Sequence, residues 1–261
     1  MDDPTLSQWL NLIFRWAHVI AGVVWIGHLY FFNFVNSQVA KTFDPESKKK
    51  VVPELMPRAL YWFRWGAAYT WVTGILLLGV VYYMGGALLD ADSDMGVGLA
   101  TGLGLGVLVV GFLVYDIIWK TPLKGSPFAG TVVSLVLLSA VAWWLSTLFS
   151  GRATFIHIGA LLGTSMAANV WMRIWPAQRK IIAAIAAGQA PDAALTSLAG
   201  MRSKHNTYMS VPLLLLMVSN HYPTLYGHGK AWLMAMAFIV AGFLLTWWFY
   251  RKAASEAPAR Y

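Results

Sequence analysis

The chain has 261 residues, of which 58% are hydrophobic and 11% are charged, and its formal net charge is +8 at neutral pH. Soluble domains carry roughly 25% charged residues, so this composition excludes an ordinary soluble protein and predicts one embedded in lipid. The chain has no cysteine, which excludes disulfides, iron–sulfur clusters and the covalent link of c-type haem.

Seven apolar segments are long enough to cross a bilayer as helices, which takes about 20 residues each. We therefore predict an all-α, polytopic membrane bundle of seven transmembrane helices that forms a single domain over residues 1–261. The sixth segment is short and contains Pro212, so we expect its helix to extend upstream towards Met201 or to kink. The seven spans are expected near 10–35, 60–84, 97–119, 128–149, 154–176, 206–222 and 230–250.

The lysines and arginines at the ends of the spans and between them predict the orientation of the bundle. Fifteen lie on one side: Lys41, Lys48, Lys49, Lys50, Arg58, Lys120, Lys124, Arg173, Arg179, Lys180, Arg202, Lys204, Arg251, Lys252 and Arg260. Three lie on the other side: Arg15, Arg152 and Lys230. Cytoplasmic loops carry the excess of positive residues, so we expect the N-terminus outside and the C-terminus in the cytoplasm of a bacterial inner membrane.

The N-terminus and the longest segment between spans carry further signals. The acidic leader Asp2-Asp3 and the length of the first apolar run argue against a cleaved signal peptide. The largest segment between spans is 177–205, in which the apolar stretch 181–185 predicts a surface helix at the cytoplasmic face.

Histidines lie within or at the ends of several spans, where an ionisable side chain is costly and by default marks function. The predicted topology sorts them by depth. An outer group consists of His18, His157, His221 and His228, and an inner pair consists of His28 and His205. Since the ten residues between His18 and His28 amount to about 15 Å of helix, these two cannot bind one metal atom.

This pattern predicts haem held between imidazoles from different helices. His18 and His157 form the best axial pair, with His221 as the main rival for either position, and His28 and His205 could hold a second centre. We expect one or two haem b groups. Asn169 and Arg173, four residues apart on the fifth span, could bind a haem propionate or only close the end of the bundle.

Other interpretations of the histidines remain open. Imidazoles near span ends can be interfacial side chains, and buried ones also serve proton relays and non-haem metals. Asp116 could form a structural ion pair with Arg64 or take up protons.

Three blocks of residues resemble the membrane domain of membrane-bound bacterial urate hydroxylases. The first is Arg15-Trp16-x-His18 with Trp25-Ile26-Gly27. The second is Gly159-Ala160, Gly163-Thr164, Met166, Asn169-Val170, Ile174, Pro176 and Gln178. The third is His205-Asn206-x-Tyr208, Pro212, Met217, Ser219-Asn220-His221-Tyr222-Pro223 and Tyr226-Gly227-His228.

The resemblance implies a helical membrane bundle that takes part in oxidising urate towards 5-hydroxyisourate and passes electrons to the respiratory chain. In that family a cytochrome c domain follows the bundle. This chain ends at Tyr261 without a cysteine, so we expect the electron acceptor to be a separate cytochrome c or respiratory-complex subunit. Many members also carry a small residue where His28 stands.

Two functions of different classes follow. The first is a haem b electron carrier or oxidoreductase in the lipid bilayer, with a small purine as a possible substrate. The second is a non-catalytic membrane subunit or a transporter, in which the histidines pack or relay protons. The chain lacks paired Gly- or Pro-interrupted spans in two halves, which gives transport little support. No nucleic-acid partner is expected.

Overall fold

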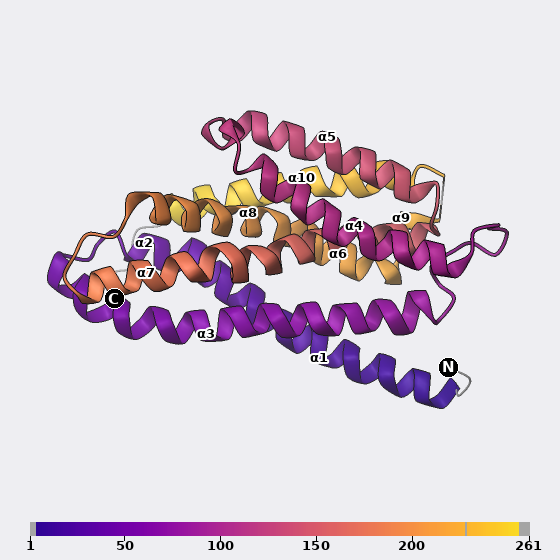
Figure 1. Cartoon of the computed structure of the whole chain (residues 1–261), viewed down its shortest axis with the longest axis horizontal. Coiled ribbons are helices and arrows are strands. Elements are labelled where there is room, and N and C mark those ends of the chain that lie inside the picture. The colour runs from indigo at the N-terminus through magenta and orange to yellow at the C-terminus, as the bar shows by residue number, and fades with distance from the viewer. Residues whose placement is uncertain (1–3, 228, 256–261) are drawn as a thin grey trace. The chain divides into compact units, whose positions relative to one another are not determined.

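The computed structural model describes residues 4–227 and 229–255, which form helices joined by loops, with no strand among them (Figure 1). Large apolar side chains stay exposed along these helices, as for Val23 at 68% and Leu244 at 63%. Six helical segments of the described residues are long and apolar enough to cross a membrane: Pro4–Val39, Pro45–Tyr83, Val97–Ile118, Pro127–Ser146, Gly151–Ala186 and Ala231–Ser255. The predicted class, an all-α multi-pass membrane protein, is confirmed.

The first two spans are longer than the sequence predicts, because regular helix continues past their apolar cores. Helix α1 (Pro4–Tyr30) runs directly into a π-helix, η1 (Phe31–Asn36), and the short α2 (Ser37–Val39). Helix α3 (Pro45–Leu77) continues as a second π-helix, η2 (Leu78–Tyr83). Helix α3 starts well before residue 60, where the sequence predicts the span to begin, because the charged segment 45–59 is rich in good helix formers.

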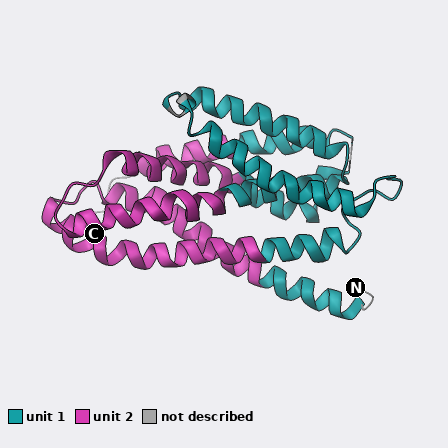
Figure 2. Ribbon diagram, viewed as in Figure 1, with its two compact units in different colours: residues 1–16, 73–165, 212–241 teal, residues 17–72, 166–211, 242–261 magenta. Residues whose placement is uncertain are grey.

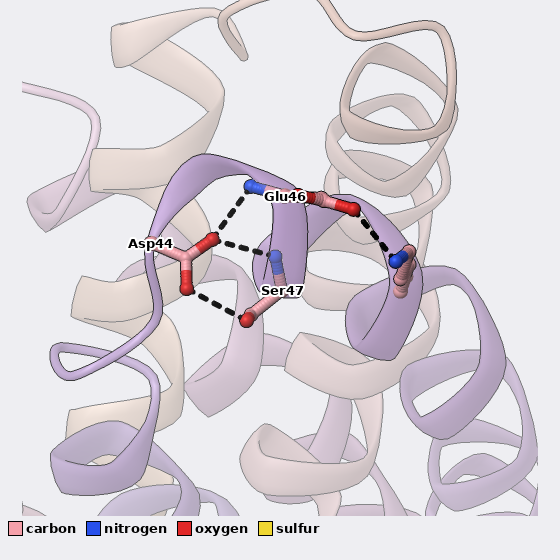
Figure 3. Close-up of polar contacts among 4 residues, drawn as sticks. Asp44, Glu46 and Ser47 are labelled. Atoms are coloured by element: carbon pink, nitrogen blue, oxygen red, sulfur yellow. Dashed lines mark hydrogen bonds and ion pairs between the residues drawn. The ribbon is translucent and has the colours of Figure 1, made fainter.

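Asp44 caps the N-terminus of α3 (Figure 3). Its Oδ1 accepts hydrogen bonds from the backbone N–H groups of Glu46 and Ser47, both at 2.9 Å, and the Ser47 hydroxyl donates to Oδ2 at 2.8 Å. The hydrogen bonds from Ser47 are the main reason why the pKa of the Asp44 carboxyl is lowered. One turn later Lys50 pairs with Glu46 at 2.7 Å, which supports the extended first turns.

The next two spans lie close to their predicted bounds. Helix α4 (Val97–Ile118) is joined through a short 3₁₀-helix, η3 (Pro122–Gly125), to α5 (Pro127–Ser146), and the two helices pack side by side (Figure 1). Asp116 is buried near the end of α4 and forms an ion pair with Lys120 at 2.6 Å.

The fifth span continues into the segment for which a surface helix was predicted. Helix α6 (Gly151–Asn169) is followed by a third π-helix, η4 (Val170–Ile174), and by α7 (Trp175–Ala186). The apolar side chains of Ile181 and Ile185 are buried against Ala199 of the following helix and partly buried Val52. A helix therefore forms where the sequence predicts one, and its apolar face packs on protein.

Helix α8 (Ala193–Val218) covers residues 206–218 of the predicted span 206–222 and starts further upstream than Met201. Pro212 lies inside the helix. The chain then forms a 3₁₀-turn, η5 (Ser219–His221), the short α9 (Pro223–Tyr226) and α10 (Ala231–Ser255). Four polar side chains of α8 are fully buried, and this polar content distinguishes α8 from the other spans: Arg202, Asn206, Thr207 and Ser210.

The contacts divide the chain into two compact units, shown in two colours in Figure 2. Unit 1 comprises residues 1–16, 73–165 and 212–241, and unit 2 comprises residues 17–72, 166–211 and 242–261. In unit 2, Gly66 of α3 allows a close approach to α1, since a Cβ there would lie 3.0 Å from the backbone nitrogen of Trp25.

Candidate functional site

The most deeply buried histidine of the chain's described part is His157 on α6, in unit 1, with 0% exposure. Its Nδ1 lies 2.8 Å from the carbonyl oxygen of Ala153, one turn earlier. A carbonyl oxygen only accepts hydrogen bonds, so we assign the ring proton to Nδ1 and a lone pair to Nε2. Metal-binding histidines are commonly fixed by such a hydrogen bond from their other ring nitrogen.

Three aromatic side chains of unit 1 surround the His157 imidazole. The ring of Phe149 lies 4.9 Å away, and those of Tyr83 and Tyr82 lie 5.8 and 6.2 Å away between centroids. The Tyr83 hydroxyl lies 3.1 Å from Nε2 and donates to it. Both tyrosines belong to the π-helix η2, whose wider turn keeps consecutive side chains closer in direction than an α-helix does.

Helix α4 approaches the same nitrogen closely at Gly104. A Cβ at this position would lie 2.8 Å from His157 Nε2 and 3.1 Å from the Tyr83 hydroxyl. Any larger residue would therefore collide with the imidazole unless the ring or α4 shifted. The hydrogen bond at Nδ1 leaves Nε2 as the nitrogen that could bind a metal, and Nε2 now contacts the Tyr83 hydroxyl and lies close to α4 at Gly104.

A polar cluster lies next to this imidazole in unit 1, and we call Arg152, Asn220 and Tyr82 the Arg152 cluster. The Asn220 Oδ1 accepts a hydrogen bond from Arg152 Nε at 2.8 Å and another from the Tyr82 hydroxyl at 2.7 Å. The Arg152 guanidinium carbon lies 5.7 Å from the centroid of the Tyr82 ring. These residues come from α6, η5 and η2, far apart in the sequence.

His221 directly follows Asn220 in η5, but its side chain is exposed. An exposed imidazole is less suited to hold haem than a buried one, because water competes for the metal and the protein fixes the ring less firmly. His228, the fourth member of the predicted outer group, lies outside the described residues.

Unit 2 contains a second group of buried polar side chains, around Asn169. The Asn169 Nδ2 donates to the Oδ1 of Asn206 at 2.9 Å, and Asn206 Nδ2 donates to the carbonyl of Met166 at 2.9 Å. The fully buried Arg202 reaches Asn169 Oδ1 at 3.4 Å. We call Asn169, Arg202 and Asn206 the carboxamide cluster.

Arg173 is half-buried on η4. The sequence placed it on one helical face with Asn169, as residues four apart are in an α-helix. The π-helix begins at Val170, between the two, and its hydrogen bonds span five residues rather than four. The four-residue spacing therefore no longer corresponds to one turn.

The three remaining candidate histidines lie in unit 2 and are half-buried. His28 is fixed as His157 is, with Nδ1 2.7 Å from the carbonyl oxygen of Val24. His205 lies on α8 near the positive charges of Arg202 and Lys204. His18 lies on α1.

His18 and His157 share one feature that sequence reasoning missed. Phe31, the first residue of η1, lies thirteen residues after His18, and Val170, the first residue of η4, lies thirteen residues after His157. π-Helical turns occur frequently at functional sites. The two histidines thus hold equivalent positions in two helices of the same construction.

Other members of these clusters were also missed. Arg202 was counted as a loop cation, although a polar stripe at Arg202, Asn206 and Ser210 follows the four-residue helical spacing and could have indicated a buried polar face. Tyr83 and Gly104 give no local signal, because they meet His157 only in the folded chain. Within residues 4–227 and 229–255, no three His, Asp or Glu side chains lie together as a metal site.

Comparisons with known proteins point to one family. The family model described as "Urate oxidase N-terminal" matches residues 4–52 and 43–261, which together cover nearly the whole chain. No curated protein and no solved structure matches the chain.

Proposed function

Because the chain belongs to the urate oxidase N-terminal family, we propose that it is a urate hydroxylase-like membrane redox protein that binds haem b. It passes electrons to a separate cytochrome or respiratory-complex subunit. The observation that carries this proposal is the environment of His157: complete burial, a proton fixed on Nδ1, and Gly104 beside Nε2.

In this proposal His157 would hold the haem, and His18 is the second residue that would hold it. The support for His18 is its equivalent position, thirteen residues before a π-helical segment. His28 has the carbonyl-fixed geometry of a ligand and could hold a second haem together with His205.

Bound haem would supply a one-electron redox centre between a reduced substrate and an external acceptor. The protein's own residues fix the imidazole and exclude water from it. Ala153 holds the His157 ring in one tautomer, and the rings of Phe149 and Tyr82 shield it. The hydroxyl of Tyr83 hydrogen-bonds Nε2 and would give up this contact to a metal. Burial and the hydrogen bond to the second ring nitrogen are the factors by which a protein sets a haem potential.

We also propose α8 as a seventh crossing, with the N-terminus outside and the C-terminus in the cytoplasm of the bacterial inner membrane. The 26 residues of α8 span about 39 Å as a helix, more than the hydrocarbon core. Its buried polar residues lower its hydropathy, but polar groups within a membrane are accommodated when they face the protein interior.

The proposal is tested by absorption spectra of the purified protein, oxidised and dithionite-reduced, produced in cells that make haem. We expect a b-type band in the wild type, its loss in His157→Ala and His18→Ala, and its retention in His221→Ala, whose side chain is exposed. A wild type without a b-type band would refute haem binding. Colourless, stable protein that co-purifies with other subunits would favour the accessory-subunit alternative.

A further inference from the structure

The Arg152 cluster in unit 1 presents hydrogen-bond donors that the protein itself does not use. The Oδ1 of Asn220 accepts from both Arg152 Nε and the Tyr82 hydroxyl. Arg152 also hydrogen-bonds the Tyr82 side chain, and among residues 4–227 and 229–255 no other partner of its guanidinium, and none of the Asn220 Nδ2, is found. Four or more N–H bonds are thus available at one place.

The cluster is also positively charged, and no carboxylate of the described residues forms an ion pair with it. The charges of Arg152 and Arg15 both act on Tyr82. The ion pairs of the described carboxylates lie elsewhere, as Glu46–Lys50, Glu54–Arg58 and Asp116–Lys120. Two guanidinium groups near one phenol, with unused N–H donors, favour an anion.

The cluster can be reached from solution and lies against the proposed haem ligand. Arg152 and Asn220 are half-buried, and the neighbouring His221 and Tyr222 are exposed. The buried ring of Tyr82 contacts the guanidinium and lies 6.2 Å from the His157 ring. One aromatic ring therefore separates the cationic group from His157.

We infer that Arg152 binds the anionic purine substrate, and that Asn220 and Tyr82 are positioning residues that hold its guanidinium. The inference rests on the proposed function, since it takes a urate-type monoanion as the ligand. The guanidinium fork suits two adjacent acceptors of a planar anion, and the Asn220 amide adds a third donor. The Asn220 Oδ1 holds Arg152 through Nε. The two Nη nitrogens of the guanidinium lie on the far side of this hydrogen bond and can face a ligand.

A purely structural role would also explain these contacts, because they join α6 to η2 and η5. The two roles differ in one respect: only the binding role depends on the positive charge being available to a ligand. Asn220→Asp separates them, since the carboxylate has the same shape and still accepts both hydrogen bonds, but it neutralises Arg152 and repels an anion.

The experiment is calorimetric titration of the purified full chain in detergent with urate, and with the uncharged purine caffeine as the comparison ligand. We expect urate binding to weaken about tenfold or more in Arg152→Gln and Asn220→Asp, since hydrogen bonds to charged groups are the strong ones. Arg152→Lys retains part of the affinity, because it keeps the charge and loses the fork. The matched control, Arg58→Gln, removes an exposed arginine from unit 2 and binds urate as the wild type does.

Haem spectra of the same samples separate this inference from the proposed function. Wild-type urate affinity in Arg152→Gln, no urate binding by the wild type, or equal binding of caffeine would each overturn the inference, whatever the spectrum shows. A missing haem band with Arg152-dependent urate binding would refute haem and support the site. If Arg152→Gln aggregates in size-exclusion chromatography, the isosteric Asn220→Asp decides the outcome.

Discussion

At the scale of single residues, Gly104 and His157 form a close contact within unit 1. Glycine is required at position 104 because of the close approach of an imidazole, not because of its backbone conformation. A methyl group there would lie 2.8 Å from Nε2, closer than van der Waals contact permits. The imidazole or α4 would have to shift, and either shift moves the lone pair.

We predict that Gly104→Ala lowers haem affinity about tenfold or more, the usual effect of disturbing the surroundings of a metal ligand. The measurement is haem content per purified chain from the b-type band. Gly102→Ala is the control, because position 102 lies on the same helix and has no atom within 4 Å of an added Cβ. Equal haem content in the two variants would contradict the proposed role of Gly104.

The sequence predicted some of these residues and not others, for physical reasons. His157 could be expected inside the bundle, because its position along an apolar run determines its depth. Its contacts with Tyr83 and Gly104 could not, because they depend on how helices pack. Arg202 was misread as a surface cation since a charge between two apolar runs usually lies in a loop, whereas here the helix begins at Ala193 and buries it.

At the scale of helices, the start of α3 depends on Asp44. Its carboxylate satisfies two N–H groups that have no partner within the helix and carries the charge that the positive end of the helix dipole favours. The hydrogen bonds lower its pKa, so the stabilisation is fully present above the usual aspartate pKa of about 4. It is lost as the pH falls through the lowered pKa of the folded protein.

We predict that Asp44→Ala loosens the first turn of α3 at neutral pH and that Asp44→Asn, which keeps a capping oxygen, does so much less. Hydrogen exchange of the amides of Glu46 and Ser47 measures this. Thermal unfolding of the wild type and Asp44→Asn from pH 6 to pH 3 tests the contribution of the Asp44 charge. The difference between their unfolding temperatures should be constant near pH 6 and shrink as the pH falls towards 3. A temperature difference that grows towards pH 3 would contradict the stabilising role of the ionised Asp44 carboxylate.

Helix boundaries were the least predictable part of the fold. The bounds of α4 and α5 follow their apolar runs, because lipid surrounds much of both helices. The lengths of α3 and α7 do not, since each continues as helix into charged sequence stabilised by local pairs or by packing of Ile181 and Ile185. The three π-helical segments η1, η2 and η4 had no signal in the hydrophobic pattern.

At the scale of the whole molecule, the cysteine-free chain allows its orientation to be tested directly. We predict that a cysteine replacing Ser93, in the acidic loop between η2 and α4, reacts with a membrane-impermeant maleimide added to spheroplasts. A cysteine replacing Gln189, in the loop between α7 and α8, should react only after the cells are lysed. Both positions are exposed.

The loop with Ser93 and the loop with Gln189 are separated by three segments: α4, α5 and α6–α7. If each of these segments crosses the membrane, the two loops lie on opposite sides. Labelling of Gln189→Cys in intact spheroplasts would contradict the proposed orientation. Labelling of a cysteine at Thr42, in the loop between α2 and α3, should follow that of Gln189→Cys and checks the first two spans independently.

The buried polar face of α8 has a consequence for biogenesis. Alone in the translocon, this segment would offer Arg202, Asn206 and Ser210 to lipid, and the arginine by itself costs about 3 kcal/mol near the middle of a bilayer. If α8 left the translocon before the helices that pack against it, α8 would not enter the membrane. Its insertion must therefore wait for a segment already made, such as α6 with Asn169, to receive these groups. A chain from which the α6 segment is deleted would leave α8 outside the membrane.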